Sequence, residues 1–584
     1  MKETIKKTII TLLAIMLLTH AYAQEDETMS SERGEGPVST DQARMAMQMK
    51  HQRLVGAHVQ EAASSSVYLT LNDDVFHELN VEPEQDQIGL NRLLNLDVDL
   101  RSLQGYQGKK PLDLGFGAAV PQGGAIVWTG MITAENAAAM RLHFKNVNLP
   151  EGAELYVYND LGEAYGPFTG QGPHQRGDFW ADTTFGDTVW VQLHAPAEVI
   201  DQATFTISEV AQFGDKFRLA SHKVDQAKGK TCNPGGVDSC VENAECYSGS
   251  LVDNASEAVA HIVYKSDADN KWYICSGGLV NDTDNTTNIP YFLTANHCIS
   301  SSSEAESVTA YFDFKTSGCG SLTSSCSSRF NNAKSVSGAS LLVTGDATEG
   351  DYSLLKLSKF PSGSYWRLGW NAGDYSDNQD ETIYRVSHPN GYPQAYSTSY
   401  IDTSISTCAN RNRPVYIWSY PIEGGTMGGS SGSPVLNSNQ QIIGQLRGGC
   451  TSDTECTSTT RVMDGSLRHA FYRNMRPYLK PTYMRVKSIT VTQENISTLK
   501  RAKAVYEVVD SSGVAVSGAL VQAMISGPFP SIGIGITDQE GKATLYGNPS
   551  PIGGTWTACT MLVLHGGISA DWDASRDSET CDSN

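Results

Sequence analysis

The first 231 residues contain no cysteine, whereas the rest of the 584-residue chain contains twelve. Ten of these lie between residues 232 and 456, and the last two are Cys559 and Cys581. No pair has the CxxC spacing that is typical of a structural zinc site. An even number of cysteines in an exported chain favours disulfide bonds over metal ligation. The distribution indicates a cysteine-free front, a disulfide-rich middle and a tail with one bridge.

Positive charge is also scarce, with 43 Lys and Arg against 64 Asp and Glu and a net charge of −21. Such a chain repels a phosphate backbone, which argues against nucleic-acid binding. Long apolar runs are missing after the N-terminal leader, so nothing there predicts a membrane-spanning helix. The overall composition is that of ordinary globular protein. The length predicts two to four domains.

The N-terminus has the pattern of a secretory signal peptide over residues 1–23. Three lysines within the first seven residues precede an apolar core, Ile9–Leu18, which is too short to span a bilayer. Ala21-Tyr22-Ala23 fits the small-x-small cleavage pattern, so Gln24 is expected to begin the processed chain. The alternative is an uncleaved membrane anchor. We expect a secreted protein that passes through the periplasm, has no membrane contact after processing and is monomeric.

Composition divides the remainder into four parts. Residues 24–65 are polar and indicate a flexible or weakly helical segment. Residues 66–230 alternate apolar and polar side chains between turns, which predicts a β-rich domain; it ends in His222–Thr231, which looks like an exposed, cleavable linker. Residues 231–482 combine short strands with longer loops. Residues 483–584 alternate again, which predicts an Ig-like β-sandwich. The predicted fold class is all-β.

The stretch TANHC, residues 294–298, places a histidine beside a cysteine just after an apolar run. Such a pair could be two metal ligands, a Cys/His catalytic pair, or a catalytic histidine next to a disulfide. A lone histidine before a cysteine is also common for purely structural reasons. The stretch alone leaves these alternatives open.

A second stretch, GGSSGSPV at residues 428–435, places Ser431 among glycines. A tight turn of this kind can expose a serine hydroxyl while neighbouring backbone N–H groups converge on one point, as a tetrahedral oxyanion requires. A serine hydroxyl needs a base to become a nucleophile, and the base needs an acid to fix its tautomer. His297 and Asp351, which opens the apolar run YSLLKL, can supply both. Taken singly, these motifs are more often an ordinary loop, turn or structural histidine.

Together the motifs resemble the trypsin-like serine peptidases, and most closely bacterial lysyl endopeptidase, over roughly residues 235–480. CSGGLVNDTDNTTNIPYFLTANHC is similar to the segment in which two cysteines bracket the catalytic histidine, and GSSGSP is similar to the nucleophile loop. The subgroup likeness rests on the spacing of Cys240 and Cys246, the YFLTA run, ATxxDYSLLKL, SHPN at 387–390 and GQLRGG at 444–449. The resemblance implies a chymotrypsin-like double β-barrel.

The resemblance also implies the role of each residue. Ser431 attacks the scissile carbonyl, His297 transfers the proton, and Asp351 orients the imidazole. The backbone N–H groups of Gly429 and Ser431 hold the oxyanion. The glycines of GQLRGG, Gly448 and Gly449, bind the substrate. No cofactor and no metal are expected.

The resemblance pairs Cys275 with Cys298, which answers the question that TANHC raises: the cysteine belongs to a disulfide that holds His297 at the cleft. It also pairs Cys246 with Cys319 and Cys240 with Cys456. In the tail, Cys559 and Cys581 form the expected bridge. The sequence leaves the partners of four cysteines open: Cys232, Cys326, Cys408 and Cys450.

The sequence departs from the trypsin pattern at the pocket for the P1 side chain, the residue before the scissile bond. Gly425 stands where trypsin has its specificity aspartate. Lysyl endopeptidases place this acid later in the chain, after the strand that corresponds to GQLRGG, so the resemblance makes Asp464 the candidate acid for a basic P1 residue. Its alternative is a turn or helix-cap role, and Glu423 is a weaker candidate. Arg447 stands where relatives carry an aromatic ring or histidine, and we expect it at the neighbouring subsite. Lysine is favoured over arginine at P1.

Ser430 stands where vertebrate enzymes have the aspartate that pairs with the freed N-terminus, so that activation salt bridge is expected to be absent. We therefore expect the β-rich domain to act as a prodomain, assisting folding and blocking the cleft, until cleavage after Lys228 or Lys230. The alternative is an N-terminal domain that is retained. The expected partners are protein or peptide substrates. The alternatives are a trypsin-like peptidase of looser specificity, and an inactive relative that acts in binding or adhesion, a task that could also belong to the tail.

Overall fold

The computed structural model describes residues 27–584 except 73–74, 76–78, 80–85, 109, 215–216, 218–239, 285–287, 321, 323–333, 406, 451–460, 482–483, 511–512 and 565–578. The expected signal peptide and linker, with Lys228 and Lys230, therefore lie outside the described residues. The chain forms two compact units, one of residues 1–281 with 290–472 and the other of residues 282–289 with 473–584. No helix in the described ranges is long and apolar enough to cross a membrane.

The N-terminal segment, for which the composition indicated a flexible or weakly helical chain, contains a helix. After β1 (Thr28–Met29) and β2 (Glu32–Glu35), the helix α2 covers Thr40–Gly56. A capping box starts this helix: Ser39 Oγ accepts from the Gln42 N–H, and the Gln42 side chain accepts from the Ser39 N–H. Both bonds satisfy donors that a helix start leaves unpaired. A short 3₁₀ helix, η1 (Gln60–Ser65), follows.

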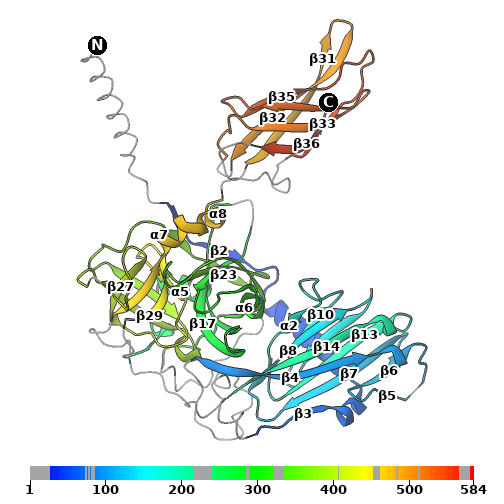
Figure 1. Ribbon diagram of the computed structural model, residues 1–584, viewed down its shortest axis with the longest axis vertical. Helices are drawn as coiled ribbons and strands as arrows, with labels where there is room; N and C mark the ends of the chain where they lie inside the picture. The colour runs from blue at the N-terminus through cyan, green and yellow to red at the C-terminus, as the bar shows by residue number, and fades with distance from the viewer. Residues whose placement is uncertain are drawn as a thin grey trace. The chain divides into compact units, whose positions relative to one another are not determined.

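The described residues between 66 and 217, here called the N-terminal domain, form two sheets packed on a common core, antiparallel except for the parallel pairing of β3 with β7 (Figure 1). The core contains Trp128, Phe144 and Phe205. The first sheet has the order β10-β9-β13-β7-β6-β5, with β3 beside β7. Its strands are β3 (Val67–Leu69), β5 (Leu112–Asp113), β6 (Ala118–Gln122), β7 (Ala125–Ala134), β9 (Glu154–Tyr158), β10 (Ala164–Phe168) and β13 (Thr188–Pro196). The second sheet contains β4 (Gln87–Asp99), β8 (Ala139–Asn148), β11 (Phe179–Trp180), β12 (Thr184–Phe185) and β14 (Thr204–Phe213).

The first barrel of the middle region follows β15 (Glu242–Asn243) and α5 (Ser250–Ala258). The strands pair as β20-β19-β16-β17-β18-β22-β21, and β20 leads directly into β21 through Gly338, whose φ is 81°. Its elements are β16 (Val259–Lys265), β17 (Lys271–Leu279), β18 (Tyr291–Ala295), α6 (Ser302–Ser307), β19 (Thr309–Phe312), β20 (Ser335–Ser337), β21 (Ala339–Gly345) and β22 (Tyr352–Leu357).

The second barrel is a closed ring in the order β25-β26-β27-β30-β29-β28, with β28 pairing again with β25. The ring consists of β25 (Thr382–Ser387), β26 (Ala395–Ile401), β27 (Tyr416–Glu423), β28 (Pro434–Leu436), β29 (Gln441–Gly449) and β30 (Val462–Ser466). Two connecting strands, β23 (Ser364–Arg367) and β24 (Gly369–Asn371), pair with β2 and β1 of the N-terminal segment. The two barrels confirm the predicted all-β, chymotrypsin-like double barrel.

Helical turns α7 (Leu467–Ala470), η8 (Phe471–Met475) and α8 (Arg476–Leu479) lead out of the second barrel. The C-terminal unit has two sheets around one core that includes Tyr506 and Trp556. One sheet contains β31 (Met484–Ile496), β32 (Leu499–Asp510) and β35 (Lys542–Tyr546). The other contains β33 (Leu520–Ser526), β34 (Ser531–Ile536), β36 (Thr557–Leu564) and β37 (Cys581–Ser583). The Ig-like assignment of this unit stays a prediction.

Candidate active site

Asp351 lies where the two barrels meet. It directly precedes β22 of the first barrel and has a left-handed backbone with φ of 57°, so its side chain turns out of the strand direction. Gln445 of β29 reaches across from the second barrel and donates from Nε2 to the Gly350 and Asp351 carbonyls at 2.8 and 3.2 Å. The Asp351 side chain is fully buried. The junction therefore fixes this carboxylate in place.

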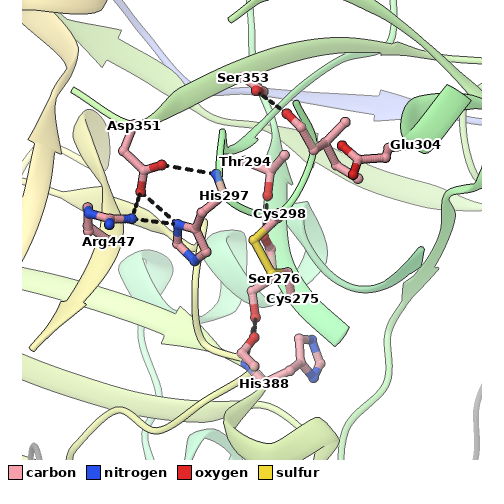
Figure 2. The surroundings of a disulfide bond; sticks show 12 residues. Cys275, Ser276, Thr294, His297, Cys298, Glu304, Asp351, Ser353, His388 and Arg447 are labelled. Atoms are coloured by element: carbon pink, nitrogen blue, oxygen red, sulfur yellow. Dashed lines mark hydrogen bonds and ion pairs between the residues drawn. A yellow bond between two sulfur atoms is a disulfide. The ribbon is translucent and has the colours of Figure 1, made fainter. Parts of the chain in front are cut away.

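His297 meets Asp351 from the end of β18. Its backbone N–H donates to Asp351 Oδ1 at 3.0 Å, and its Nδ1 lies 2.7 Å from Asp351 Oδ2 (Figure 2). A carboxylate only accepts, so this contact places the proton of a neutral imidazole on Nδ1 and leaves Nε2 as the proton acceptor. The side chain of His297 is about one-third exposed, at 34%. His297 is therefore held on one side and open on the other.

The pKa of Asp351 is lowered from its ordinary value of 3.8. Burial acts to raise it, but the hydrogen bond and charge of His297 and then those of Arg447 together outweigh burial. Because the folded-state pKa is lowered, ionised Asp351 stabilises the fold above the ordinary value. This contribution is lost as the pH falls through the lowered pKa.

Arg447 is a third member of this cluster. Its Nη1 donates to Asp351 Oδ2 at 2.9 Å and lies 3.1 Å from His297 Nδ1 (Figure 2). The sequence placed Arg447 at a neighbouring subsite and missed its contact with Asp351. The available signal was the spacing in GQLRGG, since Gln445 and Arg447 are two residues apart on β29 and so share one face of that strand.

Ser431 lies on a tight loop between the barrels. Gly429 and Gly432 on either side have φ of 84° and 81°, which favours glycine at both positions. The Ser276 N–H of the first barrel donates to the Ser431 carbonyl at 2.8 Å, and the Gly432 N–H donates to Leu446 of the second barrel at 2.8 Å. A Cβ on Gly432 would lie 2.7 Å from the Ala295 nitrogen, two residues before His297. Only glycine lets the loop approach the histidine strand this closely.

The loop around Ser431 also holds the expected oxyanion donors. Ser276 Oγ donates to the Gly429 carbonyl at 2.8 Å and accepts from the His388 N–H at 3.0 Å, which fixes the loop (Figure 2). Within the described part of the chain, the N–H groups of Gly429 and Ser431 have no protein acceptor. Two N–H groups free on one loop can bind a negatively charged oxygen.

Ser430 is buried, and its hydroxyl accepts from Ser387 Oγ at 3.0 Å and from the Met427 N–H at 3.4 Å. This side chain is therefore used to hold its own loop. The structure brings His297 and Asp351 into direct contact and places the Ser431 loop beside them. Among the described residues no hydrogen bond joins Ser431 to His297, and such bonds are often loose before a substrate is bound.

A disulfide between Cys275 and Cys298 ties β17 to the residue after His297 (Figure 2). The two sulfurs and a His297 ring nitrogen lie within 4.8 Å of one another, a spacing that could suit a metal ion. Both sulfurs are consumed by the disulfide, which leaves histidine as the one ligand. The disulfide therefore argues against two hypotheses for TANHC, that it holds a metal ion and that Cys298 is a catalytic nucleophile.

Replacing both Cys275 and Cys298 by serine is expected to open the base of the site. A disulfide closing a loop of this size contributes about 3 kcal/mol to the free energy of unfolding. Amide hydrogen exchange in β18 should therefore accelerate. The matched control is Cys559→Ser with Cys581→Ser, which removes a bridge of nearly equal span, 22 against 23 residues, from the C-terminal unit. Unchanged exchange in β18 of the first variant would contradict the expectation.

Two further disulfides lie in the middle region. One joins Cys246 to Cys319, and the other joins Cys408 to Cys450, a pair that the sequence left open. Cys232, Cys326 and Cys456 lie outside the described residues, and with them the expected pairing of Cys240 with Cys456.

Asp464, the candidate P1 acid, is buried in the second barrel on β30. Its Oδ1 accepts from Arg385 Nη2 at 2.7 Å, and both side chains are almost fully buried. Burial raises the pKa of Asp464, although the charge and hydrogen bond of Arg385 act to lower it. The ammonium group of a P1 lysine would therefore have to share the Asp464 carboxylate with the guanidinium of Arg385. Nothing in the sequence indicated this Arg385 contact.

The other candidate substrate residues are Glu423, Gly448 and Gly449, and Gly448 lies opposite Met463, the neighbour of Asp464 on β30. Glu423 is exposed and accepts from the Tyr247 hydroxyl at 2.9 Å, so it remains the weaker acid. Gly448 and Gly449 end β29, directly after Arg447, and both are partly exposed. Their backbone can be reached by a ligand.

Comparisons with known proteins found relatives of the middle region. Residues 235–464 match the family model "Lysyl endopeptidase, C-terminal domain". A curated lysyl endopeptidase of Pseudomonas aeruginosa is 25% identical over 320 residues, which cover 53% of this chain and 64% of that protein. The chain thus spans less than two thirds of this relative's length. A secreted RxLR effector protein of Plasmopara viticola is 27% identical over 55% of this chain and 77% of its own length.

Two solved structures show a partial likeness at low identity. The active form of a protease from M. tuberculosis covers 42% of this chain and 92% of its own, at 14% identity and a TM-score of 0.28. An HtrA-type protease with a bound tripeptide covers 51% of this chain and 95% of its own, at 15% identity and a TM-score of 0.26.

Proposed function

We propose that the middle domain, a trypsin-like serine peptidase domain by its family match over residues 235–464, is a secreted endopeptidase that works through Ser431, His297 and Asp351. The observation that carries this proposal is the pair of contacts between His297 and Asp351, at 3.0 and 2.7 Å. They hold the imidazole in the orientation and tautomer that a serine nucleophile requires, with Nε2 free to accept a proton. The Ser431 loop packs beside the same strand end.

Each residue then has one task. Ser431 Oγ attacks the scissile carbonyl while His297 Nε2 takes its proton, and Asp351 stabilises the resulting imidazolium. The N–H groups of Gly429 and Ser431 hold the oxyanion of the tetrahedral intermediate. His297 then gives the proton to the leaving amine, which leaves an acyl-enzyme on Ser431. Water attacks that ester with His297 as base, which releases the acid and restores Ser431.

For P1 we propose a basic residue, with lysine before arginine. The support is the match to a lysyl endopeptidase family model and to a curated relative of that name. Asp464 is the proposed acid, and its use requires Arg385 to give way to the P1 cation. If Arg385 stays bound to the Asp464 carboxylate, no free negative charge selects a cationic P1 side chain. The protein would then correspond to the alternative, a trypsin-like peptidase of looser specificity.

The test is a digest of a denatured protein mixture by the secreted product, with the cut sites read by mass spectrometry. A fluorophosphonate probe is applied in parallel, and its attachment site is mapped. We expect cuts after basic residues, mainly lysine, and the probe on Ser431. Cuts without a preference for basic residues would support the peptidase activity and contradict the proposed basic P1 residue. Neither cuts nor labelling would favour an inactive relative with a binding role.

We also propose that the N-terminal domain is a prodomain that assists folding and inhibits the peptidase. The two share one compact unit, which supports an intramolecular role. Release by cleavage after Lys228 or Lys230 would yield a monomeric, extracellular enzyme acting on proteins or peptides. The C-terminal unit is proposed as an Ig-like accessory domain. Retention of isolated residues 484–584 on cell walls would give that unit a binding task of its own.

A further inference from the structure

One strand of the N-terminal domain continues into the catalytic barrel. Along most of its length β4 pairs with β14 of its own domain, from Asp99 opposite Thr204 to Gly89 opposite Phe213. At its N-terminal end β4 also pairs antiparallel with β17, with Leu90 opposite Lys271 and Gln87 opposite Tyr273. Figure 1 shows β4 reaching from the N-terminal sheet to the barrel. The two domains therefore share one continuous sheet.

The pairing extends one residue beyond β4, toward the nucleophile. The Ile274 N–H donates to the Asp86 carbonyl at 3.1 Å. Two residues further along, the Ser276 N–H binds the carbonyl of Ser431 itself. A Cβ on Gly428 would lie 2.2 Å from Asp86 Oδ1. The Asp86 side chain thus rests against the loop that holds the oxyanion donor Gly429.

The N-to-C direction of β4 identifies which side of the substrate-binding cleft it fills. From Asp86 through β4, the polypeptide runs N to C away from the Ser431 loop. The part of a substrate that follows the scissile bond also runs N to C away from the nucleophile. An extended peptide that adds to the open edge of a sheet gains main-chain hydrogen bonds in the same way. Asp86 and the start of β4 therefore occupy the position that the substrate residues after the scissile bond would take.

Side chains anchor this strand to the barrel. Trp272 Nε1 donates to Asn91 Oδ1 at 2.7 Å. Ile88, Phe213 and Phe217 of the N-terminal domain share one buried cluster with barrel residues that include Trp272, Ile274 and Tyr311. The buried Arg141 donates to the Ser307 carbonyl at the same junction. The contact is thus a built interface with an apolar centre.

We propose that the edge of β17 and the Gly428 loop form the docking surface for the chain's own β4, which keeps the peptidase latent by filling the leaving-group side of its cleft. This inference rests on the proposed function. It implies a selective block: a substrate with residues beyond the scissile bond is excluded, whereas a small ester that ends at its leaving group still reaches Ser431.

The test compares two substrates on the full chain, an N-acyl lysine ester and a peptide that extends four residues beyond a Lys-X bond. The full chain is then compared with a form cut at a protease site inserted between Lys230 and Thr231 and freed of its N-terminal domain. We expect the ratio of peptide to ester kcat/KM to rise at least ~100-fold on cutting. The ratio is internal to each sample, so a fraction of misfolded protein does not change it.

Two variants of the full chain locate the block. Asp86→Ala is expected to raise the peptide-to-ester ratio about tenfold. Asp97→Ala removes a carboxylate from the same strand where it pairs with β14 alone, and should leave the ratio unchanged. Equal ratios before and after cutting would overturn the inference while the proposed function stands. Absence of ester hydrolysis and of probe labelling in both forms would instead refute the proposed function.

Discussion

Replacing Ser431 by alanine is expected to lower kcat by on the order of 10⁶ when the enzyme is freed of its N-terminal domain. The substitution removes one oxygen atom, the proposed nucleophile, and leaves the backbone bonds of its loop in place. Those bonds run from Ser276 to the Ser431 carbonyl and from Gly432 to Leu446, and neither uses the hydroxyl. The loss should therefore fall on kcat, with substrate binding and thermal stability retained.

The measurement is hydrolysis of a peptide substrate, with thermal unfolding as the check of the fold. Ser438→Ala is the matched control, since Ser438 is exposed on the turn between β28 and β29, seven residues after Ser431. The control should keep full activity. Hydrolysis by Ser431→Ala at a rate near that of the parent would remove Ser431 as the nucleophile and, with it, the proposed acyl-enzyme.

Replacing Asp351 by asparagine is expected to lower kcat by about 10⁴, the size of effect seen when a serine peptidase loses the carboxylate that sets its histidine tautomer. Here both carboxylate oxygens accept. Oδ1 takes the His297 backbone N–H, and Oδ2 takes His297 Nδ1 and Arg447 Nη1. A carboxamide has one accepting oxygen, so either orientation turns its NH₂ toward a donor. His297 then loses its orientation or its correct tautomer.

Asp346→Asn is the control, because Asp346 is an exposed loop residue whose carboxylate binds Thr348 and has no contact with His297. It should leave kcat unchanged. For Asp351→Asn, the loss should appear in kcat with KM little altered, since Asp351 is buried and acts through the histidine. A change in KM with kcat retained would contradict this role and point to Arg447 and the substrate subsites instead.

The predictable parts of the site were those that short motifs encode. GSSGSP encodes a glycine-flanked turn and TANHC encodes the end of a strand. Both are local features, so Ser431 and His297 could be singled out from the sequence. Asp351 was accessible because the residue that opens an apolar strand sits at a barrel end. The helix α2 was also accessible in principle, since Ser39 and Gln42 have capping-box spacing, but the polar, unpatterned composition around them hid it.

The parts that could not be predicted depend on which strands become neighbours. Arg447 reaches Asp351 because β29 lies beside the start of β22, and Arg385 reaches Asp464 across the interior of a closed ring. The pairing of Cys408 with Cys450 likewise depends on loops 42 residues apart in sequence. The β4 contact joins two domains that composition separates. Each of these follows from long-range register, which has no local signature.

The sheet that runs through both domains has a consequence for the solubility of the processed enzyme. Removing the N-terminal domain turns Lys271–Tyr273, which pairs with β4, into an open sheet edge. It also removes Ile88 of β4 and Phe213 of β14 from the cluster around Trp272. An open edge beside exposed apolar side chains is a template for association between copies. Its short length and its charged first residue, Lys271, limit that hazard. In the proposed enzyme, the edge that a substrate needs is thus the edge that the N-terminal domain covers, and incompletely folded chains with such an edge exposed are prone to aggregate.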